Sequence, residues 1–306
     1  MGTFAANSIP APLMRQVMEG LKKRNAQSFA SRVCRMVPVD AISGSVVVEP
    51  SIISLPTAED EGVAEGTVVT RAGGSLDELV YKTKVFKKTA EIPLGAEIQA
   101  NAVGYNMLMR RMQFCEDVSN MKLDKHFATV LASTTLNNTW SVTSNGNGQW
   151  SDGGVSSTPF DDIRTVIRLV PGADTMILGE AVANELASHP DFIAESSNFA
   201  AGTVSTSEVA DILVRKIKDL KRVFIFDAYY NGAAHGEALS LTRLFDKSVW
   251  IGYGTELPCM NLTTENPRAI NEFDGEAECR IVGFSQRKVI KRPHKELGYT
   301  LASVVA

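Results

Sequence analysis

Residues Ile98 to Leu136 read IQANAVGYNMLMRRMQFCEDVSNMKLDKHFATVLASTTL and contain no proline and one glycine. Apolar side chains recur there every three or four positions, which predicts one helical face packed on a core: Ile98, Ala102, Tyr105, Leu108, Met112, Cys115, Val118, Met121, Ala128 and Leu131. A continuous helix of this length reaches roughly 60 Å at 1.5 Å per residue, far beyond the average globular helix. The stretch therefore predicts a strut-like helix over about 98–136.

Two strand-like runs precede this helix, GTVVTRA at Gly66–Ala72 and LVYKTKVFKKTA at Leu79–Ala90, and glycines lie between them. Because glycine readily forms tight reversals, the pattern predicts a long hairpin. Lysines interrupt both faces of the second run, and a two-stranded ribbon is only marginally stable by itself in water. We expect the hairpin either to contact a neighbouring subunit or to be an ordinary edge hairpin whose lysines discourage aggregation.

The N-terminal stretch Leu13–Met36 is basic and amphipathic, with Val17 and Leu21 at helical spacing from Leu13. It predicts a helical arm that lies on its own domain, docks on a neighbouring subunit or faces an anionic interior. Val37–Leu55 follows and is rich in β-branched residues, which favours strands.

A polar linker at Asn137–Pro159, rich in Gly, Ser and Asn, is the clearest candidate domain boundary. Beyond it the pattern predicts a mixed α/β domain, and the final residues from 277 to 305 return to strands. Ser205 and Glu208 match a capping box at a helix start. Expected helices cover 161–170, 180–188 and 205–214, and expected buried strands cover 175–178 and 223–226.

The composition favours a folded protein, with 44% hydrophobic residues and a net charge of −4. No segment has the ~20 consecutive apolar residues of a membrane span, and no secretory signal is visible at the start. The mild acidity leaves no overall basic footprint for nucleic acid. The cysteines form no CxxC pair and predict free thiols in a reducing cytosol: Cys34, Cys115, Cys259 and Cys279.

Motifs that would carry catalysis are missing from the sequence. The glycines of 146–154 lack the GK[ST] ending of a phosphate loop, and no GxSxG elbow occurs. The histidines are isolated and are expected to be surface or capping residues instead of metal ligands: His126, His189, His235 and His294. We therefore predict no catalytic, cofactor-binding or metal-binding residues, although active sites can also assemble from distant residues.

Four passages occur in a recognisable order. They are KKTAEIPLGAEIQA at Lys87–Ala100, then Thr158–Glu195 and Val204–Asn231, and finally SVWIGYG at Ser248–Gly254. Together they resemble the major capsid proteins of tailed bacteriophages with the Hong Kong 97 fold. The first is similar to the junction between the extended loop and the spine helix of that family, and the others resemble its axial domain.

The resemblance implies an α+β fold of the Hong Kong 97 type, in which a peripheral domain with a long spine helix adjoins an axial α/β domain. The expected parts are an N-terminal arm over 1–45, the peripheral domain over 46–65 and 91–158, an extended hairpin loop over 66–90, the axial domain over 159–262, and return strands of the peripheral domain over 263–306.

The resemblance also implies a structural, non-enzymatic protein that assembles into pentamers and hexamers of an icosahedral shell around double-stranded phage DNA. It places the protein in the virion, after assembly in the cytoplasm of the bacterial host. Implied partners are further copies of the chain, portal, scaffolding and decoration proteins, and packaged DNA held by non-specific contact.

Candidate inter-subunit contacts lie in the arm and the hairpin: Leu13, Arg15, Tyr81, Lys82, Lys84, Val85, Phe86, Lys87 and Lys88. Two other interpretations remain open. One is an encapsulin-like compartment of the same fold that encloses cargo enzymes. The other is a cytosolic α/β enzyme whose catalytic domain spans 162–231.

Overall fold

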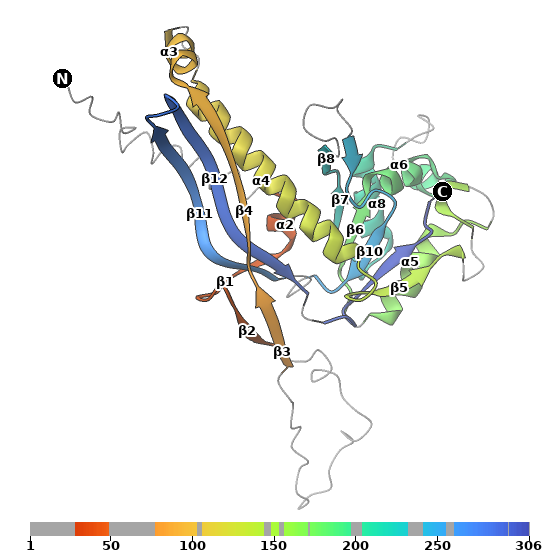
Figure 1. The fold of residues 1–306 in the computed structure, drawn as a ribbon. Coiled ribbons are helices and arrows are strands. Elements are labelled where there is room, and N and C mark those ends of the chain that lie inside the picture. Colours follow the sequence, from red (N-terminus) through yellow and green to blue (C-terminus); the bar gives the residue numbers. More distant parts are fainter. Residues whose placement is uncertain are drawn as a thin grey trace, which may run out of the picture.

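The computed structural model describes residues 28–48, 77–102, 106–143, 148–152, 156–170, 172–196, 204–231, 241–254, 260–292 and 294–305. These residues form an elongated part, in which a long helix lies along a β-sheet, and an α/β part beside it (Figure 1). This is the α+β organisation that the sequence predicts.

The sheet of the elongated part has the strand order β1-β11-β12-β4. The strands are β1 (Arg35–Pro38), β11 (Met260–Asp274), β12 (Cys279–Lys291) and β4 (Lys84–Pro93). β1 pairs with β11 in parallel, whereas the other neighbours are antiparallel. Helix α4 (Met107–Ala132) runs along β12 and β4 (Figure 1), so β4 is an edge strand that the helix flanks.

Helix α4 packs on the sheet through the apolar face that the sequence predicts, with one drift. Met112 and Cys115 are buried against Phe284 of β12. Further along, Met121 is 38% exposed, while Phe127 is fully buried. The predicted face turns away at Met121 because the steps from Met112 through Cys115 and Val118 are all of three residues, which falls short of the 3.6 residues per helical turn.

The predicted single helix over 98–136 is wrong in its bounds. The structure contains two helices, α3 (Leu94–Ala102) and α4, and α4 ends at Ala132. Asn106 starts α4 because its side chain accepts a hydrogen bond from Met109 N at 3.0 Å, as an N-cap residue does. The strut is therefore shorter than expected, although 26 residues still span about 39 Å.

The predicted hairpin is also paired differently. β3 (Asp77–Lys82) pairs with β2 (Ser43–Val48), and β4 continues from it along β12. The second run of the hairpin is thus shared between two sheets, because it finds partners distant in sequence. The first run, 66–72, lies outside the described residues.

The N-terminal helix predicted to reach Met36 is shorter within the described residues. It is α2 (Phe29–Val33), and β1 begins two residues later. Phe29 packs into an aromatic group, with ring centroids 4.4 Å from Phe226 and 6.0 Å from Phe127. The expected arm boundary at residue 45 falls inside β2.

The α/β part has a five-stranded sheet of order β5-β13-β10-β6-β7. Its strands are β5 (Asn138–Ser141), β13 (Gly298–Ala302), β10 (Val249–Gly252), β6 (Thr175–Gly179) and β7 (Arg222–Phe226). Its helices are α5 (Pro159–Leu169), α6 (Glu180–Ser188), α7 (Pro190–Glu195) and α8 (Thr206–Lys216). A short helix η3 (Trp150–Asp152) and a ribbon of β8 (Tyr229–Asn231) and β9 (Leu241–Arg243) complete the described elements.

The C-terminal strand belongs to this second sheet, which corrects the expectation that 263–306 returns entirely to the elongated part. β13 pairs with β10 and β5, and Leu301 and Val304 are fully buried in the α/β core. The burial of these side chains determines the placement. The expected boundary at 262 also falls inside β11. Whether these parts act as the peripheral and axial domains of a shell remains a proposal.

Asn137 joins the two parts where α4 ends. Its side-chain nitrogen donates to the carbonyls of Val130, Leu131 and Ser133 at 2.8, 2.9 and 3.0 Å. Its side-chain oxygen accepts from Trp250 Nε1 at 3.1 Å and from the guanidinium of Arg292. One buried amide thus connects the last turn of α4 with β10 and with the segment before β13.

Candidate assembly surfaces

The structure separates the candidate contact residues of 81–88 into two groups. Tyr81 and Phe86 are 5% and 8% exposed and pack inside the elongated part, so their side chains offer little to a neighbour. The others are exposed or, for Lys88, half-buried: Lys82, Lys84, Val85, Lys87 and Lys88. Leu13 and Arg15 lie outside the described residues.

Thr83 is the point where the strand changes sheets. Its backbone N–H and its hydroxyl both donate to Ile42 O, at 2.8 and 2.9 Å, and it belongs to neither β3 nor β4. Up to this point the odd-numbered residues 81 and 83 are buried, and beyond it the even-numbered residues 86 and 92 are buried. The side chains that face the core therefore change from odd to even positions. If alternation with a period of two is applied to the whole run 79–90, neither face is consistently apolar, and both buried faces are missed.

The outer face of the β2·β3 ribbon is exposed and partly apolar. Val80 pairs in register with Ser45, and Val47 with Glu78, which places these four residues on one face. Val80 is 67% exposed and Val47 is 60% exposed. The sequence pattern does not reveal this face, because 66–72 is a strand-like run closer in sequence to β3 than its actual partner β2.

Two further apolar groups remain uncovered within the described part of the chain. One is on the outward side of α4, where Phe114 is 48% exposed alongside Met121. The other is at the tip of the elongated part, the end that carries α3 (Figure 1). Leu94 and Ile98 belong to α3, and Phe273 of β11 pairs with Arg280, which itself pairs with Ile92 just before the helix. Large contiguous apolar patches mark partner-binding surfaces, so these groups are candidate contact surfaces.

A buried polar cluster lies between α4 and β12. Gln286 Nε2 donates to Ser119 Oγ and Asn120 Oδ1, both at 3.2 Å. One turn further along, Asp124 accepts hydrogen bonds from Ser28 Oγ and Ala30 N at 2.9 Å, which fixes α2 on α4. Burial raises the pKa of Asp124, and these hydrogen bonds oppose the rise. The cluster orients secondary-structure elements and is closed to a substrate.

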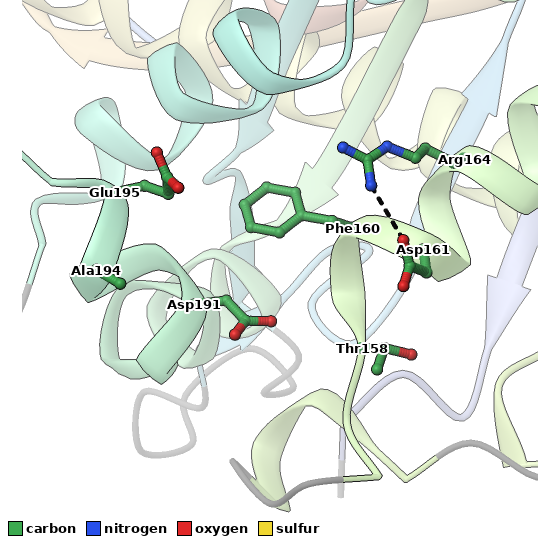
Figure 2. Close-up of a pocket in the computed structure, with 7 residues that line it drawn as sticks. All are labelled: Thr158, Phe160, Asp161, Arg164, Asp191, Ala194 and Glu195. Atoms are coloured by element: carbon green, nitrogen blue, oxygen red, sulfur yellow. Dashed lines mark hydrogen bonds and ion pairs between the residues drawn. The ribbon is translucent and has the colours of Figure 1, made fainter.

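A shallow pocket of about 310 Å³ is open on the α/β part (Figure 2). Phe160 lies in the middle of its lining and stacks on Phe192, with centroids 4.7 Å apart. Arg164 and Asp161 form an exposed ion pair at 3.0 Å (Figure 2). The charged side chains of this lining are thus in part paired with each other.

Among the described histidines, His189 has a structural role, and none belongs to a metal-ligating group. His189 is the N-cap of α7, because Nδ1 accepts from Asp191 N at 3.2 Å, and its Nε2 lies 3.1 Å from Ser157 Oγ. The prediction of a capping histidine is confirmed there. No group of three metal-ligating side chains occurs among the residues that the structure describes. No helix in that same portion is long and apolar enough to cross a membrane.

Comparisons with known proteins were made on both sequence and structure. No family model and no curated protein matches the sequence. The structure, in contrast, matches a phage-related protein of Bordetella bronchiseptica with a TM-score of 0.69 and 13% identity, over 96% of this chain and 97% of that one. It also matches the major capsid proteins of phage G with a TM-score of 0.51 and 11% identity, over 100% of both chains.

The fold is that of phage capsid proteins. A virus-like particle from Pyrococcus furiosus shares this capsid fold, with a TM-score of 0.59 and 10% identity over 96% of this chain and 100% of that chain. The Hong Kong 97-like fold predicted from the order of passages is therefore confirmed, although sequence identities are at or below 13%. These matches extend over nearly the whole chain.

Proposed function

We propose that this protein is the structural subunit of a closed shell, the major capsid protein of a tailed phage, and that it has no catalytic activity. The observation that carries the proposal is the capsid fold over nearly the full length of both chains in each comparison. The exposed apolar groups on β2·β3, on α4 and at the tip support it, because a lattice subunit must meet several neighbours through different surfaces.

The proposed shell consists of pentamers and hexamers of this chain and encloses double-stranded DNA. Portal, scaffolding and decoration proteins are its proposed further partners, and the host cytoplasm is the proposed place of assembly. A net charge of −4 fits this role, because a strongly basic wall would hold the densely charged DNA tightly.

Electron microscopy of the purified protein tests the proposal. We expect closed particles with pentameric and hexameric units, formed by the chain alone or with a scaffolding protein of the same phage. A protein that stays a monodisperse monomer at high concentration under both conditions would overturn it.

The content of particles purified from an infected host separates the phage capsid from a cargo compartment of the same fold. Packaged double-stranded DNA is the expected content. Small DNA-free particles that enclose an enzyme would instead assign the protein to the compartment class.

A further inference from the structure

Three polar side chains of β11 and β12 are buried without hydrogen-bond partners. Asn261 and Lys288 are 0% exposed, and Thr263 is 7% exposed. The amide nitrogen and oxygen of Asn261, the hydroxyl of Thr263 and the ammonium of Lys288 bond to nothing in the described part of the chain. Because roughly 90% or more of buried polar groups in folded proteins are hydrogen-bonded, three such side chains call for a partner.

The strand register brings these side chains together. Thr263 pairs in register with Lys288, and Asn261 pairs with Ile290, two residues further along β12. The register shifts of β11 begin only after Thr263. Residues paired in register project from the same face of a sheet, with Cβ atoms about 5 Å apart. Asn261, Thr263 and Lys288 thus form one group on one face, which we call the donor cluster.

The donor cluster faces α4. Gln286, two residues before Lys288, donates to Ser119 Oγ of α4. Ile290, two residues after Lys288, packs in the core that contains Phe127 of α4. Side chains two positions apart in a strand share a face, so Lys288 also points toward the helix. The cluster is therefore enclosed between the sheet and α4.

Cations exceed carboxylates around the donor cluster within the described residues. Burial lowers the pKa of Lys288 to about 8, so its ammonium is charged at pH 7. Asp124 of α4 is the nearby carboxylate, but its Oδ1 already accepts from Ser28 Oγ at 2.9 Å. Lys84 pairs in register with Lys288 and adds a second cation to this face. Burial and the charge of Lys84 lower the pKa of His126, which is therefore neutral at pH 7.

The chemistry of the cluster suits an anion. An ammonium, a primary amide and a hydroxyl together offer six donor hydrogens, whereas the amide and hydroxyl oxygens alone can accept. A buried ammonium is costly unless an opposite charge and hydrogen bonds compensate it. Water supplies hydrogen bonds without charge, whereas an anion supplies both. A monatomic anion also needs the least space among close-packed side chains.

We propose that the donor cluster binds one small inorganic anion, of the halide class, between β11, β12 and α4. The ammonium of Lys288 provides the opposite charge, and Asn261 Nδ2 and Thr263 Oγ each donate a hydrogen bond to the anion. The bound anion stabilises the contact between α4 and the sheet. The inference is independent of the proposed function, since the site lies inside one subunit.

Thermal unfolding of the purified protein tests the site, with chloride as the probe. Sodium chloride replaces sodium gluconate stepwise at constant ionic strength, because gluconate is too large for the cluster. We expect the melting temperature of the wild type to rise by roughly 2–4 °C once chloride reaches about ten times its Kd. A melting temperature that does not depend on chloride overturns the proposal.

Variants that remove one donor each assign the effect to the cluster. Lys288→Met, Asn261→Leu and Thr263→Val should each abolish or greatly weaken the rise with chloride. Lys295→Met and Thr139→Val make the same kinds of change at exposed positions and should keep the full rise. Without chloride, Lys288→Met should melt above the wild type, and the difference should narrow as chloride is added, because only the wild type binds it. A rise that all variants share contradicts the site.

Bromide gives a direct readout on the wild type that does not depend on the folding of any variant. Crystals grown in sodium bromide should show an anomalous scattering peak beside Lys288 Nζ. Density there without an anomalous signal would identify water and overturn the proposal. A bromide peak without any chloride-dependent rise in melting temperature would mean binding at crystal concentration only, which also contradicts it.

Discussion

Lys288 is a charged side chain without exposed surface, at the point where β12 faces α4. Its ammonium has no hydrogen-bond partner among the described residues. Burial lowers its pKa from 10.5 to about 8, and the charge of Asp124 opposes that change. An unpaired buried cation costs stability, so this residue weakens the subunit at neutral pH.

Replacing Lys288 with Met should therefore raise the stability at pH 7 by roughly 1–3 kcal/mol. The folded-state pKa is below the unfolded one, so the unfolded chain binds more protons between about pH 8 and 10.5. The penalty is full below pH 8 and is relieved as the pH rises, and Lys288→Met should remove this rise. Thermal unfolding from pH 7 to 10 measures it, with the exposed Lys295→Met as control. A variant that is less stable at every pH contradicts the expectation.

Asn137 is the residue whose loss should most damage the connection between the two parts. Asn137→Ala removes three bonds to the end of α4 and leaves Trp250 Nε1 and the Arg292 guanidinium without this acceptor. We expect a loss of roughly 3–5 kcal/mol in unfolding free energy, because buried donors would be left unpaired. Denaturant unfolding measures the loss, and the half-buried Asn138→Ala should change it little. Equal stability of both variants would mean that water replaces the amide.

At the level of elements, α4 has one face committed to the subunit and another left outside. Met112 is 1% exposed in the core with Ile92 and Phe284, whereas Met121 is 38% exposed on the far side. The helix therefore contributes both to the fold and to the surface that we assign to a neighbour.

Substituting an aspartate on each face of α4 in turn distinguishes these two roles. Met112→Asp buries an unpaired carboxylate, which should cost several kcal/mol, roughly 3–5, and produce insoluble or unfolded subunits. Met121→Asp should keep the fold and the melting temperature of the wild type. Circular dichroism and solubility after expression provide the measurement. Soluble, cooperatively folding Met112→Asp protein would show that this face is not a core.

At the level of the whole molecule, the exposed apolar groups on β2·β3, on α4 and at the tip are available for contacts with other subunits. The described residues form their own cores, so the subunit is expected to fold before it assembles. Segment 49–76 lies outside the described residues, and its removal tests whether folding and assembly can be separated.

The in-register pair Val48 and Asp77 allows a clean deletion. Replacing 49–76 with Asn-Gly closes β2 and β3 through a two-residue hairpin turn. The shortened chain should stay soluble, with the melting temperature of the wild type, and should form no closed particles in electron microscopy. Deleting 66–90 instead would remove Tyr81 and Phe86 from the core, and we expect that chain to unfold. Closed particles from the Asn-Gly chain would show that the segment is dispensable.

Most elements of the α/β part could be predicted from local sequence patterns. The helix cap predicted at Ser205 is confirmed, since its hydroxyl accepts from Glu208 N at 3.2 Å, although the Glu208 carboxylate accepts from Ser196 Oγ. The strands predicted at 175–178 and 223–226 are β6 and β7. These elements were predictable because caps act within one turn and apolar runs of this length favour strands. Only β6 is buried throughout as predicted, whereas β7 is buried at Phe226 and half-buried elsewhere. The order of such elements was also sufficient to indicate the capsid fold.

The pairings between distant strands depend on the folded chain as a whole. β11 carries no clear strand pattern and is interrupted by register shifts before Arg268, yet β1 and β12 hold it from both sides. The run 79–90 divides at Thr83 between two sheets, and β13 joins the α/β core in place of the elongated part. Strand partners are chosen by the burial of side chains that are distant in sequence, and no local pattern contains that information.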